Sequence, residues 1–176
     1  QMYKVRKKCA MVFQHSTLFD SMTCAENVAL PLRKHRGMKP KEALGEAHRL
    51  LETVRMREFA DRYPAALGDG MRKRVAIARA LTLEPQYVLF DEPTTSLDPV
   101  SARRVDTLIR QLSDEIGVTS IVVSHDLVSI FTIADRIVML YGGHVKLLGT
   151  PEDFRSSPDE IIQQFINGRA EEPMDA

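Results

Sequence analysis

The spacing of hydrophobic positions changes along the chain at about residue 86. Before that point apolar residues recur at helical spacing, most clearly over Lys39 to Arg55, and residues 22–83 predict a mainly helical region. The apolar segment from Ala25 to Arg36 is predicted to be broken by Pro31. Residues 1–14 predict an extended segment that ends in three apolar residues.

After residue 86, short apolar runs alternate with helical spacing. Tyr87–Phe90, Thr119–Val123 and Ile137–Leu140 predict strands, the second of them buried. Asp98 and Pro99 predict a helix start, and Gly117 predicts the end of that helix. Because strands alternate with helices, we expect an α/β fold with a mainly parallel sheet.

The end of this region carries further turn and cap signals. Asp126 is placed to cap a helix after the second strand. Gly142 and Gly143 predict a hairpin between the third strand and His144–Leu148. Polar residues 169–176 predict a flexible tail.

Composition narrows the function classes. The 176 residues carry 24 Lys and Arg against 24 Asp and Glu, so no large basic field for nucleic acid is expected. The two cysteines form no CxxC pattern, which favours a reducing compartment. No apolar run is long enough to span a bilayer, and no signal peptide is visible. Since the chain starts at Gln1, we expect residues to be missing upstream.

Two carboxylates follow the apolar run Tyr87–Phe90. Asp91 and Glu92 would lie at the carboxyl end of a buried strand, where α/β sheets place their ligands. One carboxylate there can hold Mg²⁺ through water, and its neighbour can polarise a water in phosphoryl transfer. Alone, this pattern is equally consistent with a strand that ends in a solvated acidic turn.

Four other segments accompany these carboxylates in a fixed order. Gln14 ends an apolar strand, Leu67–Met71 precedes a basic amphipathic helix, Ser96–Pro99 follows the carboxylates, and His125 ends the next strand. This set resembles the ABC ATPases over about residues 10–150: Q-loop, signature, Walker B, D-loop and H-loop. The resemblance implies a P-loop NTPase-like ABC ATPase fold with a helical signature subdomain.

That resemblance implies roles for single residues. Gln14 would contact Mg²⁺ and the attacking water, and would couple the site to a membrane partner. Asp91 would bind Mg²⁺ through water, Glu92 would be the general base, and His125 would contact the γ-phosphate of ATP. Asp98 would cross a dimer interface. The alternatives are a strand end for Gln14, a helix cap for Asp98 and a core histidine for His125.

Two departures from the family pattern affect activity. The phosphate-binding pattern GxxxxGK[ST] occurs nowhere in the chain, so we expect an N-terminally truncated domain that by itself binds ATP poorly. The signature, usually LSGGQ in this family, has Gly68, Asp69 and Gly70 at its centre. Asp69 would repel the partner's γ-phosphate and weaken the composite site, or it would only cap the signature helix.

Within the family, several segments resemble the Mla/Mce-associated lipid-transport ATPases. These are Met11–Gln14, Thr17–Met22 and Glu26–Arg33, together with Met71 in the signature. The resemblance implies a subunit that uses ATP and Mg²⁺, docks on a permease, and dimerises with itself or a second ATPase subunit. It would lie on the cytoplasmic face of the bacterial inner membrane.

Three functional hypotheses remain at this stage. The first is an ATPase that drives lipid transport, and the second is a truncated or degenerate subunit that only docks on a permease or partner. The third, a nucleic-acid ATPase, is disfavoured by the neutral charge. We divide the single partial domain, 1–176, into a helical subdomain over 22–83 and a RecA-like core portion over 84–150.

Overall fold

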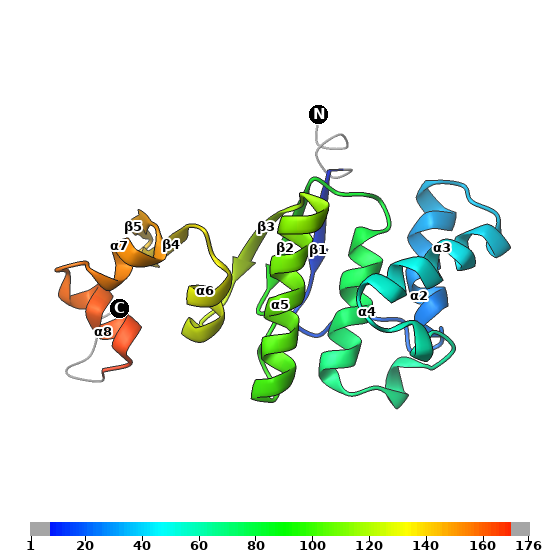
Figure 1. The fold of residues 1–176 in the computed structure, drawn as a ribbon, viewed down its shortest axis with the longest axis horizontal. Coiled ribbons are helices and arrows are strands. Elements are labelled where there is room, and N and C mark those ends of the chain that lie inside the picture. Colours follow the sequence, from blue (N-terminus) through cyan, green and yellow to red (C-terminus); the bar gives the residue numbers. More distant parts are fainter. Residues whose placement is uncertain (1–7, 170–176) are drawn as a thin grey trace. The chain divides into compact units, whose positions relative to one another are not determined.

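The computed structural model describes residues 8–169, and the chain divides into two compact units, residues 1–125 and 126–176. In the first unit, three parallel strands form a sheet in the order β1-β2-β3 (Figure 1). They span Cys9–Val12, Tyr87–Asp91 and Thr119–Val123. Helices connect these parallel strands, which confirms the α/β fold that the sequence predicts.

The two faces of this sheet differ in burial. Val88 and Phe90 of β2 are buried, whereas Leu89 between them is exposed. Leu89 pairs in register with Met11 and Ile121, which are also exposed. The prediction of a buried strand over 119–123 is therefore wrong: β3 is the last strand of this sheet, and Ile121 is 51% exposed.

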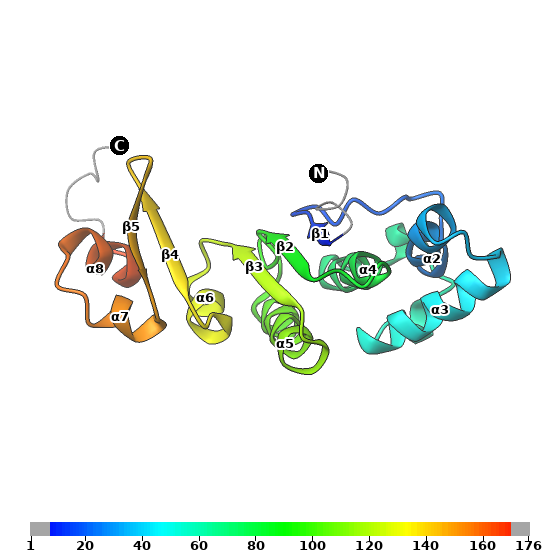
Figure 2. The same cartoon turned by 90° about the horizontal axis from the view of Figure 1, so that it is seen from above.

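Helices fill the chain between β1 and β2. They are α2 (Cys24–His35), α3 (Pro40–Thr53) and α4 (Asp69–Leu81), with short 3₁₀ turns at Arg57–Phe59 and Pro64–Ala66. The three helices pack against one another, and α4 also contacts β1 (Figure 2). Helical structure thus occupies most of the region for which the periodicity predicts it.

Pro31 does not break α2, contrary to the prediction. The helix is fixed at its start by a capping box, in which Thr23 and Glu26 bond each other's backbone N–H. Val28 and Leu32 are fully buried on its inner face. Packing and capping therefore hold the helix through a proline that lacks one backbone donor.

Helix α5 (Pro99–Ile116) begins and ends where the sequence predicts. The Asp98 carboxylate accepts hydrogen bonds from the N–H groups of Val100 and Ser101, both at 3.0 Å. Gly117 ends the helix with φ of 75°, the left-handed conformation that glycine adopts without strain. The helix contacts both α4 and β3 (Figure 1).

Within residues 126–169, the second unit contains a hairpin and three short helices. They are α6 (Leu127–Ile133), β4 (Ile137–Tyr141), β5 (His144–Gly149), α7 (Pro151–Arg155) and α8 (Glu160–Asn167). The strands β4 and β5 are antiparallel, and the two glycines between them have positive φ, which confirms the predicted hairpin. The predicted cap at Asp126 is also confirmed, because its carboxylate accepts hydrogen bonds from Val128 and Ser129.

The core of this unit is small. Met139, Phe154 and Ile162 are its buried members. Of the tail predicted over residues 169–176, residues 170–176 lie outside the described residues. The grouping of 84–150 into one core portion stays a prediction. Over residues 8–169, no helix has the length and apolar character needed to cross a membrane.

Candidate functional site

The two predicted carboxylates lie at the carboxyl end of β2. Asp91 is the last residue of the strand and pairs in register with Val123 of β3. The N–H of Glu92 donates to the carbonyl of Val123 at 2.9 Å, so Glu92 is held against the neighbouring strand. Its φ is 45°, a left-handed backbone that is strained for a residue with a side chain.

The Glu92 carboxylate contacts two side chains. His125 Nδ1 lies 2.9 Å from Glu92 Oε1, and the Thr95 hydroxyl donates to Glu92 Oε2 at 2.8 Å. Burial alone would raise the pKa of Glu92, but hydrogen bonds from His125 and Thr95 and the charge of His125 outweigh it and lower that pKa. The carboxylate is therefore kept ionised in an orientation fixed from two sides.

His125 is at the surface, with 73% of its side chain exposed. This exposure excludes the alternative of a core histidine. Because β2 and β3 are parallel and in register, the residues that follow them are neighbours, and Glu92 and His125 meet across the same edge of the sheet. The site thus brings together two residues that the sequence predicts separately.

The Asp91 carboxylate is suited to a cation. It is half-buried and accepts no hydrogen bond from any residue within 8–169, which leaves its oxygens open. No three His, Cys, Asp or Glu side chains cluster as a metal site in that part of the chain. A cation here would have few protein ligands, and Mg²⁺ is bound in this way because it retains waters and takes substrate phosphates as further ligands.

Gln14 follows β1 and lines a cavity of about 240 Å³. The cavity brings together three of the predicted segments, because Asp69 of the signature and Ser96 and Leu97 of the segment Ser96–Pro99 line it too. Its remaining lining residues are His15, Ser16, Arg72, Lys73 and Thr95. Thr95 therefore both faces this cavity and orients the Glu92 carboxylate.

Lys73 of α4 is a residue that the sequence analysis missed. It is only 2% exposed, and its ammonium donates to the carbonyls of Phe13 at 3.0 Å and Gln14 at 2.6 Å. Burial lowers its pKa, an effect opposed by the charges of Asp91 and Asp69. The signal was available, since Lys73 lies four residues before buried Ile77 and so on the inner face of α4.

The altered signature forms the first turn of α4. Gly68 is the N-cap and offers no side-chain cap bond. Asp69 lies within the helix and pairs with Arg72, which also donates to the carbonyl of Leu67 at 2.7 Å. Asp69 is thus no cap, although an acidic residue in the first turn is still favourable.

Gly70 and Asp98 lie where the starts of α4 and α5 approach each other. A Cβ at Gly70 would come within 3.0 Å of Ser101 Cβ, so this position requires glycine or a shift of α5. Hydrogen bonds from the hydroxyl and N–H of Ser101 lower the pKa of Asp98. The cap role of Asp98 is therefore confirmed, and its role at a dimer interface stays a prediction.

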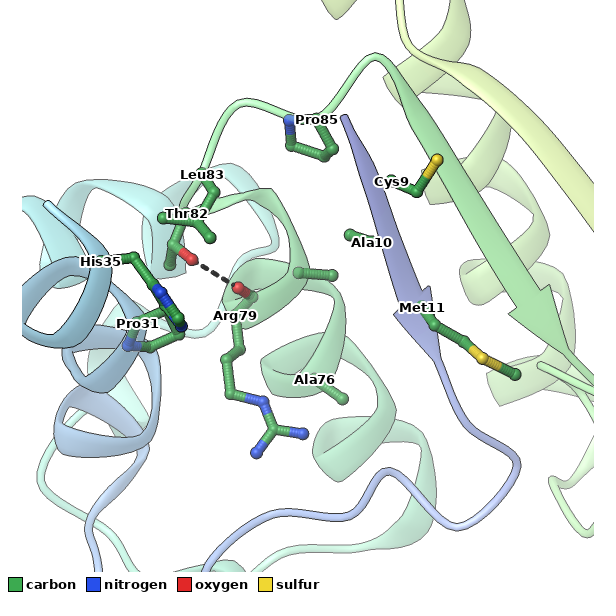
Figure 3. A pocket seen from close by; sticks show the side chains of 11 residues that line it. Cys9, Ala10, Met11, Pro31, His35, Ala76, Arg79, Thr82, Leu83 and Pro85 are labelled. Atoms are coloured by element: carbon green, nitrogen blue, oxygen red, sulfur yellow. Dashed lines mark hydrogen bonds between the residues drawn. The ribbon is translucent and has the colours of Figure 1, made fainter. Parts of the chain in front are cut away.

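A second pocket, of about 250 Å³, lies beside β1 and contains none of the predicted site residues (Figure 3). Cys9 and Met11 line it from β1, Pro31 and His35 from α2, and Arg79 from α4. Figure 3 shows the Arg79 side chain extending along α4 away from Thr82, whose hydroxyl donates to the Arg79 carbonyl at 2.7 Å. The pocket is thus distinct from the carboxylate site at the end of β2.

Known proteins similar to this chain are ATP-binding proteins of transporters. The sequence pattern of the ABC transporter family matches residues 1–95. The intermembrane phospholipid transport ATP-binding protein MlaF of Escherichia coli is 36% identical over 174 residues, which are 99% of this chain and 65% of that protein. The sulfate/thiosulfate import ATP-binding protein CysA of Vibrio vulnificus is 42% identical over 164 residues, 91% of this chain and 48% of that protein.

The fold agrees with these matches. The ATP-binding cassette MJ0796, solved as a dimer bound to ADP and phosphate, superposes with a TM-score of 0.74 at 36% identity, covering 85% of this chain and 66% of that one. The chain spans about half to two thirds of the length of the curated relatives it matches. By sequence pattern, whole-chain identity and fold, the chain belongs to the ATP-binding proteins of the ABC transporter family.

Proposed function

We propose that this chain supplies part of the ATP-hydrolysing site of an ABC transporter subunit. The observation that carries the proposal is the contact between Glu92 and His125. Glu92 directly follows Asp91 in the chain, and the Thr95 that binds its carboxylate lines the same cavity as Gln14 and Asp69. One edge of the sheet thus holds an ionised base, a histidine and the open carboxylate of Asp91. These are groups that phosphoryl transfer requires.

Each residue has a defined task in this proposal. Asp91 and Gln14 hold Mg²⁺, which when bound offsets the negative charge of the phosphates. Glu92 accepts the proton of the attacking water, and its lowered pKa keeps it ionised at neutral pH. His125 and Thr95 fix the orientation of that carboxylate. In an assembled dimer, Gly68, Asp69 and Gly70 face the nucleotide of the second subunit, and Asp98 contributes to the interface.

For the cargo we propose phospholipid. The phospholipid-transport protein MlaF of Haemophilus influenzae is 37% identical and, like its E. coli counterpart, covers 99% of this chain. Met71 in the signature also fits that subgroup. Sulfate is the competing cargo because CysA matches. The protein named probable ribonucleotide transport ATP-binding protein mkl of Mycobacterium leprae also matches, at 34% identity. The partners are then a permease in the inner membrane and a second ATPase subunit, with this protein on the cytoplasmic face.

ATP hydrolysis tests the catalytic part when it is measured on the full-length protein, which supplies the phosphate-binding loop, and on its Glu92→Gln variant. Loss of the base should lower the turnover rate by about 100-fold or more while ATP still binds. Glu115→Gln is the matched control, because it removes an exposed carboxylate of α5 outside the site and should leave turnover unchanged. Wild-type turnover in Glu92→Gln would refute the role of Glu92.

A second candidate function is docking without catalysis. It is favoured by Asp69, which places a carboxylate in the signature turn. The two functions differ in one measurement: a docking subunit co-purifies with its permease but releases no phosphate from ATP.

A separate measurement decides the cargo. The rate at which labelled phospholipid moves between membranes is compared with the rate of sulfate uptake.

A further inference from the structure

We propose that Lys73 and Arg79 of α4 are positioning residues that fix the segment from Phe13 to Thr17 rigidly against α4. We name residues 13–17 the Q segment. Through this clamp the signature helix determines where Gln14 lies. The inference rests on the proposed function, in which Gln14 belongs to the ATP site. It adds that the position of Gln14 is fixed by two side chains of α4.

The first half of the clamp is Lys73. It lies in the second turn of α4, about sixty residues along the chain from the Q segment, and its ammonium donates to two successive carbonyls, Phe13 at 3.0 Å and Gln14 at 2.6 Å. A lysine that is 2% exposed loses nearly all of its hydration, so these contacts replace water as its partners. The ammonium therefore has little freedom to leave the Q segment.

The second half is Arg79, six residues further along α4. Its guanidinium donates to the Thr17 carbonyl at 2.9 Å, the Ser16 carbonyl at 3.1 Å and the Thr17 hydroxyl at 3.1 Å. Burial lowers the pKa of Arg79, yet the group remains charged because an arginine loses its proton only far above neutral pH. Two cations of one helix thus bind four of the five carbonyls in the Q segment.

The backbone of the Q segment needs such a clamp. Ser16 and Thr17 both have positive φ, of 62° and 44°, and Thr17 is β-branched, for which this conformation is unfavourable. Only two backbone hydrogen bonds lie within the segment, from Ser16 N to the Phe13 carbonyl and from Thr17 N to the His15 carbonyl. Strained conformations of this kind persist when surrounding contacts fix them, and here those contacts come from α4.

Amide hydrogen exchange on the chain with Lys73→Met tests the clamp without any need for ATP. Exchange at the amides of Ser16 and Thr17 should accelerate by about tenfold or more relative to Leu108 and Ile109 of α5, which report on global unfolding. Arg74→Met is the matched control, because Arg74 belongs to the same helix but donates to the carbonyls of Val54 and Arg55, at 3.4 and 3.3 Å. It should leave the Q segment unchanged.

Two further variants keep the test decisive if Lys73→Met does not fold. Lys73→Gln retains one donating group, and Arg79→Lys retains the charge but loses the forked donor. Each should accelerate exchange in the Q segment by less than Lys73→Met but by more than Arg74→Met. Equal exchange in the Q segment of all these variants and of the wild type would overturn the proposal.

A double-mutant cycle with Gln14→Ala separates positioning from general loss of stability. If Lys73 acts through Gln14, Lys73→Met lowers the turnover rate in the wild type but causes little further loss when Gln14 is already removed. Full additivity of the two substitutions would overturn the proposal. These turnover rates are measured on the full-length protein, which supplies the phosphate-binding loop. Absence of ATP hydrolysis by its wild type would instead refute the proposed function, and the exchange measurement would still decide on the clamp.

Discussion

Glu92 and His125 are 33 residues apart in the chain, yet Glu92 Oε1 and His125 Nδ1 lie 2.9 Å from each other. The contact follows from the parallel register of β2 and β3, which places Asp91 opposite Val123. Both strands therefore end at the same level, and Glu92, one residue past β2, lies beside His125, two residues past β3. Any substitution that shifts this register separates Glu92 from His125.

The pairing predicts how stability depends on pH. Because the pKa of Glu92 in the folded protein lies below its ordinary value, the pairing stabilises the fold above that ordinary value of about 4.3 and is lost as the pH falls through the folded pKa. The unfolding free energies of wild type and Glu92→Gln should therefore differ by at most about 1 kcal/mol at pH 5.5, and the difference should be smaller at pH 3. Urea unfolding at both pH values measures this, and a difference that is unchanged at pH 3 would contradict it.

Gly70 predicts a local packing conflict. Replacing glycine by alanine within a helix usually stabilises it by about 0.5–1 kcal/mol. Gly45→Ala in α3 should show this gain, since a Cβ there meets nothing within 4 Å. In Gly70→Ala the new Cβ meets Ser101 at 3.0 Å, so the gain should be absent or reversed. Thermal unfolding compares the two, and Ser101→Gly should restore the gain at Gly70; equal gains at both positions would contradict the conflict.

Asn27 predicts a large loss of stability from a small chemical change. Its side chain is fully buried, accepts from Phe19 N at 2.8 Å, and donates to the carbonyls of Phe19, Met22 and Thr23 at 3.0–3.1 Å. In Asn27→Asp a carboxylate would face those three carbonyls, and the unfolding free energy should fall by about 2–4 kcal/mol.

Asn167→Asp is the control for that loss. Asn167 is exposed, and its amide donates to the Gln163 carbonyl at 2.8 Å, so the same substitution should change stability by less than about 0.5 kcal/mol. Urea unfolding of both variants checks the contrast. Similar losses at the two positions would show that Asn27 does not hold the turn that leads into α2.

The altered signature predicts a gain of activity on reversal. Gly68→Ser together with Asp69→Gly should raise the ATP turnover of the proposed full-length dimer if Asp69 repels the partner's nucleotide. Arg72→Gln is a useful companion, because it removes the cation that pairs with Asp69 and should lower turnover by unmasking the carboxylate. Unchanged phosphate release in the double variant would show that Asp69 does not weaken the site.

Helix ends, the hairpin and the end of β2 are predicted well, because their signals lie in neighbouring residues. The helix from Pro99 to Ile116 is fixed by its own cap and terminal glycine, and the hairpin by its paired glycines, so neighbouring residues carry the information. The strand end at Asp91 is likewise visible in an apolar run followed by carboxylates. Such features need no contact with distant parts of the chain.

Long-range contacts are the part that escaped prediction. Lys73 is a lysine in a basic segment, which is typical of an exposed residue. Its burial is explained by the Q segment, whose carbonyls accept hydrogen bonds from its ammonium. Pro31 predicts a break in the helix because proline acts on its own turn. The packing of α2 on α3 and α4 overrides that effect, and it depends on residues far along the chain. Ile121 of β3 lies on the same exposed face of the sheet as Met11 and Leu89, and strand propensity does not encode which face is exposed.

The left-handed backbone of Glu92 implies a trade-off between folding and chemistry. Glycine adopts a φ of 45° without strain, so in a library of variants selected only for folding, glycine would be enriched at this position. A library selected for ATP turnover would retain glutamate despite the strained conformation. The difference between those two enrichments would measure how much folding stability the protein forgoes to keep a carboxylate at the end of β2.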